Sequence, residues 1–351
     1  MNIVEVEKLK VGMVLSRTVT DSKFVVILSE NTVLNDKHIA ALKAAQIPAV
    51  YIKDEYELSK LFQQFSSITR KDTSFTNKFE HVAKFATRVF DEIKEGGEIK
   101  HAVVLLTMKI MPMVDDPSSV NYLFTLGHRN NSLALHGERV AIFAGIIAKW
   151  MNFTMDEIRV LMIAAFLHDI GKFKFPQSLI DKPVNELSDR ELMLYKSHPQ
   201  IGAALLRRFK FTEPIPTIIM QHHERVNGSG FPNKIHGDRI HLFAKIIAVA
   251  DAYDNLIIER PGFVKKTPFD AVNYFIRSQY TLFDPTVCVP LLTRIKDNLV
   301  GSTVTLSDGR HGRVIFYPKD FSALPIIGLD DGSQINLNRT AGLAIVEYHI
   351  S

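Results

Sequence analysis

Helical periodicity dominates the long central part of the sequence. From about residue 100 to residue 297, apolar side chains recur at steps of three and four, which gathers them on one face of each helix. Capping boxes, in which a hydroxyl residue stands three positions before a glutamate, are visible at Thr154 with Glu157 and at Ser188 with Glu191. This pattern predicts an all-α bundle in the centre of the chain.

Two shorter regions of different character flank the helical part. Residues 9–53 combine short β-rich runs with a stretch of helix formers, which indicates a small α+β unit. After residue 299, runs of Val, Ile and Thr are separated by turn signals such as Asp308-Gly309 and Asp331-Gly332. We therefore predict a mainly α protein with a small α+β unit at residues 1–65, a linker helix at 66–100, the all-α domain at 101–297 and a small β-rich unit at 298–351.

Composition and charge exclude several classes of protein. Hydrophobic residues make up 46% of the 351 residues and charged residues 23%, as in ordinary soluble globular proteins. The 42 basic and 38 acidic residues are scattered and leave a net charge of only +4, which gives no case for binding duplex nucleic acid. The apolar run at 140–148 is far shorter than the roughly 20 residues that span a bilayer. Because the single cysteine, Cys288, cannot form an internal disulfide, we expect a buried structural thiol and a cytoplasmic protein.

Histidine and aspartate residues continue several of the buried helical faces. The stripe through Val140, Phe143 and Ile147 extends back to His136, so that this imidazole is expected to point into the core. Other stripes lead to the pair His168 and Asp169, with Gly171 as the expected helix stop, and to further polar residues of the same two kinds. The complete set comprises five histidines and two aspartates: His136, His168, Asp169, His198, His222, His223 and Asp251.

Metal ions would explain why these polar side chains face inward. A single buried histidine is usually a hydrogen-bonded core residue, but a buried carboxylate costs several kcal/mol unless it is paired or coordinates a metal. Imidazole and carboxylate ligands without thiolates suit Fe, Mn or Zn, and more than four ligands indicate more than one ion. Pairs of metal ions hold the attacking and leaving oxygens in phosphate-ester hydrolysis. The set therefore predicts a metal-dependent phosphohydrolase.

Two motifs in this region carry a resemblance to a known family. His168-Asp169-Ile170-Gly171-Lys172 is similar to the HD-x-GK motif, and residues 222–232, HHERVNGSGFP, are similar to HHExxDGxGYP. These two motifs are the signature pair of the HD-GYP family. The resemblance covers roughly residues 130–286, about half of the chain, and includes His198-Pro199, Asp251 with the residues around it, and Arg260-Pro261.

The resemblance implies a specific fold, chemistry and set of roles. HD-GYP domains are all-α HD-type bundles with a di-iron, di-manganese or mixed site, and they hydrolyse the bacterial second messenger cyclic di-GMP to pGpG or GMP. By this resemblance the seven histidines and aspartates are metal ligands, Asp169 bridges two ions, and His168, Asp169 and Lys172 form the reacting centre. It assigns substrate contacts to Lys172, Arg260, Gly228, Gly230 and Phe231. It leaves open a homodimer or a signalling-protein partner.

All departures from the family pattern lie outside the seven predicted metal ligands. Phe231 stands where the family has Tyr, so the ring is kept and the hydroxyl is lost, and Asn227 replaces an Asp. Ser132 occupies the position at which members with three metals carry a Glu ligand, which predicts two divalent ions. Phe263 replaces a basic residue common after the Arg-Pro pair. We expect these changes to alter substrate binding or regulation more than metal binding.

Two alternatives to a cyclic di-GMP phosphodiesterase stay open. The altered residues in and near the second motif are compatible with hydrolysis of another cyclic dinucleotide. A second alternative is a receptor or scaffold that binds cyclic di-GMP with little turnover. The complete set of metal ligands favours an enzyme, because a binding module has no need for seven buried metal-coordinating side chains.

Overall fold

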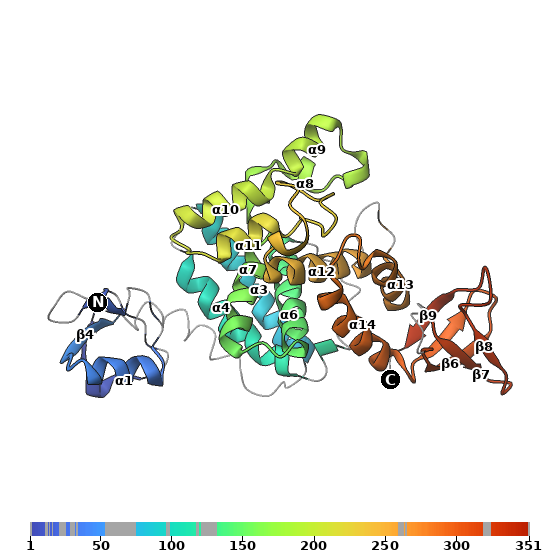
Figure 1. Cartoon of the computed structure of the whole chain (residues 1–351), viewed down its shortest axis with the longest axis horizontal. Coiled ribbons are helices and arrows are strands. Elements are labelled where there is room, and N and C mark those ends of the chain that lie inside the picture. Colours follow the sequence, from blue (N-terminus) through green and yellow to red (C-terminus); the bar gives the residue numbers. More distant parts are fainter. Residues whose placement is uncertain are drawn as a thin grey trace. The chain divides into compact units, whose positions relative to one another are not determined.

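The described part of the chain falls into two compact units. The computed structural model describes residues 2–10, 13, 15, 17–20, 26–28, 32, 34–52, 75–95, 99–116, 119–120, 132–258, 263, 265–318 and 324–349. The first unit comprises Met1–Asp72 and the second Thr73–Ser351. The chain is drawn in Figure 1 in sequence colours.

The first unit is a small α+β fold. Its elements are β1 (Asn2–Glu5), η1 (Val6–Lys8), β2 (Val19–Thr20), β3 (Val26–Leu28), α1 (Asp36–Ala44) and β4 (Ala49–Ile52). The strand pairs β1–β4 and β2–β3 are both antiparallel. Helix α1 starts where the Asn35 side chain accepts a hydrogen bond from the His38 amide, and it buries Leu42 in a core of its own with Leu15, Leu34 and Ile52.

The second unit contains the helices that carry the candidate site. Its helical elements are α3 (Phe75–Glu95), α4 (Lys100–Asp115), α6 (Leu133–Trp150), α7 (Met155–Leu167), η2 (Ile170–Lys174), α8 (Gln177–Ile180), η3 (Val184–Glu186), α9 (Asp189–Tyr195), α10 (His198–Arg208), α11 (Ile215–Gln221), η4 (Gly237–Arg239), α12 (Leu242–Ile257), α13 (Pro268–Ser278) and α14 (Pro285–Leu299). Helix α6 packs on α3, α4, α7 and α12, and α10 packs on α11 and η2.

Local sequence signals account for the ends of these helices. Both predicted capping boxes are present: Thr154 caps α7 with Glu157, and Ser188 caps α9 with Glu191. The Ser132 side chain accepts a hydrogen bond from the Leu135 amide and so caps α6, whose residues are almost all buried. A helix that is buried on nearly every side lies in the centre of a bundle, and this one carries His136.

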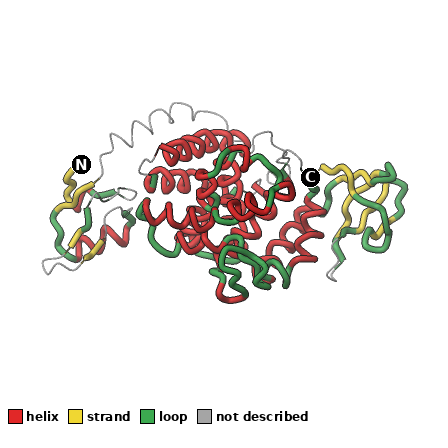
Figure 2. Tube along the Cα trace, turned by 90° about the horizontal axis from the view of Figure 1, so that it is seen from above, coloured by secondary structure: helices red, strands yellow, loops and turns green. Residues whose placement is uncertain are grey.

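A five-stranded antiparallel sheet follows α14. Its strands are β5 (Thr303–Leu306), β6 (His311–Phe316), β7 (Ile326–Leu329), β8 (Gln334–Asn336) and β9 (Ile345–His349), in the order β8-β7-β6-β5-β9. The predicted turns are formed with Gly309 and Gly332 at positive φ, which glycine adopts without steric cost. Figure 2 shows the change from helices to strands in this part of the chain.

The predicted fold class is confirmed: the described part of the protein is mainly helical, with two small N-terminal strand pairs and a C-terminal antiparallel sheet. The helix expected near residues 66–100 is α3, which packs on α4 and α6 inside the second unit. Cys288 is buried, as expected. None of the described helices is long and apolar enough to cross a bilayer.

Candidate metal centre

The helical bundle brings together all seven predicted ligands from five places in the chain. His136 lies on α6, His168 caps the end of α7, and Asp169 follows it. His198 opens α10, His222 caps the end of α11 with His223 next to it, and Asp251 lies on α12. Six of the seven are buried, and His223 is half-buried.

The role expected for Gly171 was wrong. Helix α7 ends at Leu167, and Gly171 lies inside η2 without a positive φ, so it does not stop the helix. A Cβ atom at this position would instead collide with the carbonyl oxygen of His198 and lie 2.8 Å from the Gly202 amide nitrogen. Glycine therefore allows η2 to pack directly on α10, which brings Asp169 next to His198.

The seven side chains form two clusters that share Asp169. One cluster contains Asp169, His198, His222 and His223, and the other His136, His168 and Asp251. Asp169 Oδ1 lies 3.2 Å from His198 Nε2 and 3.8 Å from His222 Nε2. Its second oxygen, Oδ2, lies 3.5 Å from His168 Nε2 and 3.6 Å from His136 Nε2. One carboxylate thus faces both clusters, one with each oxygen, which is the arrangement expected of a bridging ligand.

Backbone carbonyls fix which histidine nitrogen faces each cluster. The Nδ1 atoms of His168, His198 and His222 bond to the carbonyl oxygens three residues earlier. Because a carbonyl only accepts, these Nδ1 atoms carry the proton and leave a lone pair on each neutral Nε2. The Nε2 atoms of His198 and His222 nevertheless lie only 3.3 Å apart. Two lone pairs at this distance repel each other unless a cation lies between them, and this protonation pattern is typical of metal-binding histidines.

Burial and neighbouring charges give the four side chains of the Asp169, His198, His222 and His223 cluster ionisation states that suit metal ligands. Burial lowers the pKa of His198, His222 and His223, which keeps these imidazoles neutral. Burial alone would raise the pKa of Asp169, but the charge of Lys172 lowers it well below its usual value. Asp169 Oδ1 and His223 Nε2 are buried without a hydrogen-bond partner in the described structure. Such atoms are costly unless something binds them, and a divalent ion between them would do so.

Sequence reasoning assigned no role to Asp254, which supports His136. Asp254 Oδ2 lies 2.8 Å from His136 Nδ1, and the Arg139 guanidinium donates two hydrogen bonds to the same carboxylate, at 2.6 and 2.9 Å. All three side chains are buried. Asp254 therefore orients the Nε2 atom of His136 towards Asp251 and Asp169. The available signal was the spacing: His136 and Arg139 are three residues apart on α6, as are Asp251 and Asp254 on α12, so each pair shares a helix face.

Lys172 is a cation at the edge of the clusters. Its ammonium donates to Asp169 Oδ2, and its side chain is 13% exposed. Burial alone would lower the pKa of Lys172, but the adjacent Asp169 carboxylate raises it well above its usual value. The residue stays positively charged at any physiological pH and is placed to contact an anionic group that reaches the clusters.

The second motif forms a loop that rests on His223. Phe231 stacks on the His223 ring with the centroids 4.5 Å apart, and its amide donates to the His223 carbonyl. A Cβ atom at Gly230 would lie 2.5 Å from the carbonyl oxygen of His223, so the loop approaches this backbone as closely as only glycine allows. Gly228 has a φ of +76°. The Asn227 side chain accepts from the amide and hydroxyl of Ser229, so it shapes the loop.

One predicted substrate contact lies outside the described residues, namely Arg260. Ser132, which stands where a third metal would need a Glu ligand, caps α6 with its hydroxyl.

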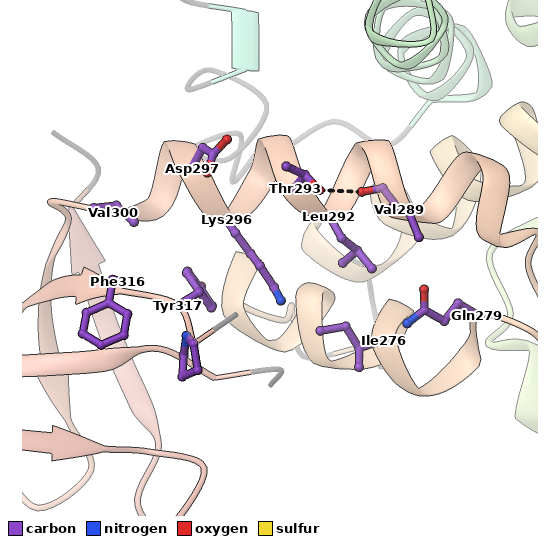
Figure 3. Close-up of a pocket in the computed structure, with 11 residues that line it drawn as sticks. Ile276, Gln279, Val289, Leu292, Thr293, Lys296, Asp297, Val300, Phe316 and Tyr317 are labelled. Atoms are coloured by element: carbon purple, nitrogen blue, oxygen red, sulfur yellow. Dashed lines mark hydrogen bonds between the residues drawn. The ribbon is translucent and has the colours of Figure 1, made fainter. Parts of the chain in front are cut away.

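A separate pocket lies between the last helices and the C-terminal sheet. It has a volume of about 410 Å³ and is lined by side chains of α13, α14 and the end of β6. Figure 3 shows the Lys296 side chain directed towards the space between Ile276 and Tyr317. None of the seven proposed metal ligands lines this pocket, so it is separate from the histidine and aspartate clusters.

Comparison with known proteins finds a family and several relatives that are similar to the part of the chain that carries this site. Residues 125–287 match the HD domain family. The chain is 37% identical over 169 residues to the cyclic di-GMP phosphodiesterase response regulator RpfG of Xanthomonas campestris. The matched region covers 48% of this chain and 44% of RpfG. The chain is 32% identical over 151 residues to the 3'3'-cGAMP-specific phosphodiesterase 3 of Vibrio cholerae, which covers 43% of this chain and 32% of that protein. The chain thus spans less than half of the length of either relative.

A solved structure shares the fold over most of the chain. It is Bd1817, described as an HDG"Y"P protein from Bdellovibrio bacteriovorus, and it matches with a TM-score of 0.55 and 20% sequence identity. The match covers 84% of this chain and 99% of Bd1817. At this identity the likeness concerns the fold alone.

Proposed function

We propose that this chain is a metal-dependent phosphodiesterase that hydrolyses a cyclic dinucleotide, because residues 125–287 match the HD domain family and the chain is similar to named cyclic dinucleotide phosphodiesterases. We propose cyclic di-GMP as the substrate, with pGpG or GMP as the product. The supporting observation is the pair of buried clusters that share Asp169, because hydrolysis of a phosphodiester by two metals needs two adjacent sites joined by a bridging ligand.

The donor set fits two divalent ions of the first transition row. Asp169 Oδ1, His198, His222 and His223 would hold one ion, and Asp169 Oδ2, His136, His168 and Asp251 the other. Five imidazoles, two carboxylates and no thiolate suit iron or manganese, which are the metals we propose. When bound, such ions neutralise phosphate charge and lower the pKa of water, so that hydroxide is available near neutral pH.

The chain's own groups bind and orient the phosphate. Lys172 is permanently cationic and lies beside Asp169, so it is placed to donate to a phosphate oxygen. Phe231 presents an aromatic ring next to His223, and the Lys196 ammonium lies 5.9 Å from its centre. The loop from His223 to Phe231 therefore offers a ring and a cation at the edge of the site, which suits a base and its phosphate. Arg260 is proposed as a further contact.

The choice of cyclic di-GMP over a hybrid dinucleotide rests on the relatives. RpfG, at 37% identity, is named as a cyclic di-GMP phosphodiesterase, whereas the Vibrio relative at 32% identity is named as specific for 3'3'-cGAMP. Both reactions use the same bond chemistry, so the clusters are compatible with either substrate. Recognition of the second base belongs to the loop, where this chain has Asn227 and Phe231.

A substrate panel tests the proposal directly. Protein purified without oxygen and loaded with iron or manganese is incubated with cyclic di-GMP and, in parallel, with 3'3'-cGAMP, and the nucleotides are separated by chromatography. We expect pGpG or GMP from cyclic di-GMP. Turnover of 3'3'-cGAMP without turnover of cyclic di-GMP would contradict the proposed substrate and support the proposed phosphodiester hydrolysis. No product from either nucleotide, in protein with a full metal complement, would contradict the proposed enzyme and favour the receptor.

A further inference from the structure

Tyr195 brings a second aromatic side chain to the metal centre, and sequence reasoning gave it no role. It is the last residue of α9, two residues after the exposed Met193 and three before His198. Its carbonyl oxygen accepts a hydrogen bond of 2.7 Å from His198 Nδ1, and its ring packs edge-on against the His198 ring with the centroids 5.3 Å apart. The start of α10 therefore fixes Tyr195 relative to a proposed metal ligand.

The side chain of Tyr195 reaches across to Lys172. The Lys172 ammonium lies 5.1 Å from the centre of the Tyr195 ring, within the range of a cation–π contact. The ammonium thus lies between the Asp169 carboxylate and the Tyr195 side chain.

The contact between Lys172 and Tyr195 matters because the Asp169 carboxylate cannot bind the Lys172 ammonium and two metal ions equally well. Both oxygens of Asp169 face the clusters, and Oδ2 is also the partner of the Lys172 ammonium. Divalent ions would compete for the carboxylate and repel the ammonium. Of the described contacts of Lys172, the one with Tyr195 does not involve a proposed ligand, so it remains when the ligands are engaged.

On the basis of the proposed function, we propose that Tyr195 is a positioning residue that holds the Lys172 ammonium at the edge of the metal centre, where it meets a phosphate of the substrate. The loop residue Phe231 lies against His223. Tyr195 therefore brings a further aromatic ring to the site, from α9. Its effect reaches the substrate through Lys172.

The test compares removal of the hydroxyl with removal of the whole ring. Full-length manganese-loaded protein is prepared as wild type, Tyr195→Phe, Tyr195→Leu, Lys172→Met and the double variant Tyr195→Leu with Lys172→Met. Tyr280→Phe is the matched control, because Tyr280 is 64% exposed and lies outside both clusters. Three quantities are measured: metal per chain by elemental analysis, binding of GMP by calorimetry, and kcat and KM for cyclic di-GMP.

We expect Tyr195→Leu to keep its metal, to weaken GMP binding and raise KM about 3- to 10-fold, in the range of one cation–π contact, and to change kcat less. Tyr195→Phe should have a smaller effect, because the ring that faces the Lys172 ammonium is kept. In the Lys172→Met background, Tyr195→Leu should add nothing, because a positioning residue needs the group that it positions. Tyr280→Phe should behave as wild type.

Several outcomes would overturn the proposal. These are unchanged GMP affinity and KM in Tyr195→Leu, additive effects of Tyr195→Leu and Lys172→Met, or loss of metal in Tyr195→Leu, which would mean that Tyr195 acts through His198. Failure of wild-type protein to bind GMP would also contradict it, since Lys172 would then meet no phosphate. Failure of the proposed substrate is distinguishable, because it would abolish turnover of cyclic di-GMP and leave the GMP measurements intact.

Discussion

Asp169 connects the two halves of the site more directly than any other described residue. Its two oxygens face different clusters, so its replacement removes a donor from both. We expect Asp169→Ala to leave well under one metal ion per chain and to lower kcat at least about 1000-fold, since both charge neutralisation and water activation depend on the ions. Elemental analysis and turnover check this, with the exposed Asp238→Ala as the control. Full metal content in Asp169→Ala would rule out a bridging role.

Asp254 provides a test of how the site is supported. It holds His136 Nδ1 at 2.8 Å while Arg139 neutralises its charge. We expect Asp254→Asn to weaken metal binding at the cluster of His136, His168 and Asp251 about 10- to 100-fold, the usual effect of removing an outer carboxylate. Competition with a coloured chelator measures this affinity, and Asp308→Asn, on the C-terminal sheet, is the control. An unchanged affinity would mean that the backbone alone orients His136.

The histidines of the metal-free protein give a pH dependence with a defined sign. Burial alone would lower the pKa of His136, but hydrogen bonds to Asp251 and Asp254 raise it to about 9. The stability that His136 contributes to the fold is fully present below its unfolded pKa of about 6.5 and is lost as pH rises towards 9. His198, His222 and His223 have lowered pKa values, so they destabilise the fold as pH falls below about 6.5.

These four histidines therefore give chelator-treated protein a stability maximum near pH 6.5, which thermal melts between pH 5 and 9 would reveal. Metal binding should follow a different course, because His136 must lose its proton to become a ligand. Metal affinity is expected to rise from pH 6.5 to 9 and to release a proton. A metal affinity that is constant over this range would contradict the assignment of His136 as a ligand.

At the scale of elements, the loop of the second motif is held from two sides. The amides of Val226 and Asn227 donate to the carbonyls of Leu282 and Thr281, in the turn between α13 and α14. The Glu224 carboxylate accepts from the Asn233 amide at the far end of the loop. The loop is therefore fixed by hydrogen bonds on both sides of Gly230, and a larger residue there has little room.

Gly230→Ala tests this close packing. The added Cβ would lie 2.5 Å from the His223 carbonyl oxygen and the Arg225 amide nitrogen, so the loop must shift. We expect a loss of about 1–3 kcal/mol in the free energy of unfolding and a raised KM, because the Phe231 ring moves away from His223. Gly309→Ala is the matched control: its φ of +87° makes a side chain cost about 1–2 kcal/mol, but it lies in the C-terminal sheet. Equal effects on KM in the two variants would contradict the role of the loop.

Sequence patterns predicted helix starts better than helix ends and contacts between helices. The capping boxes at Thr154 and Ser188 were read correctly, because a cap depends on neighbours in the chain. Gly171 was misread as a helix stop, because its role depends on α10, which lies more than 20 residues later. Asp254 received no role for the same reason, since a charged residue usually lies at the surface and its partners are on α6.

At the scale of the whole molecule, the site belongs to the second unit alone. All seven proposed ligands lie between residues 136 and 251, and the first unit has its own core, which includes Leu15, Leu42 and Ile52. We expect a fragment of residues 73–351 to bind as much metal as the full chain, measured by elemental analysis. Loss of metal in the fragment, with its helical content retained by circular dichroism, would mean that the first unit supports the site.

The order of the α+β, helical and β-rich regions along the chain was predictable from the sequence. The exact residues at which one region ends and the next begins were not. The change from helical spacing to β-rich runs after residue 299 marks the start of the C-terminal sheet, whose first strand begins at Thr303. Helix α3 shows ordinary amphipathic spacing in the sequence, and its packing on α4 and α6 is a tertiary property that a single sequence does not display.

The number of metal ions in one chain tests the central claim most directly. Protein purified without oxygen and supplied with iron or manganese is analysed for metal per chain. The two clusters that share Asp169 predict two ions. One ion or none, in protein that is fully folded by circular dichroism, would contradict the binuclear centre and the phosphodiester chemistry proposed from it.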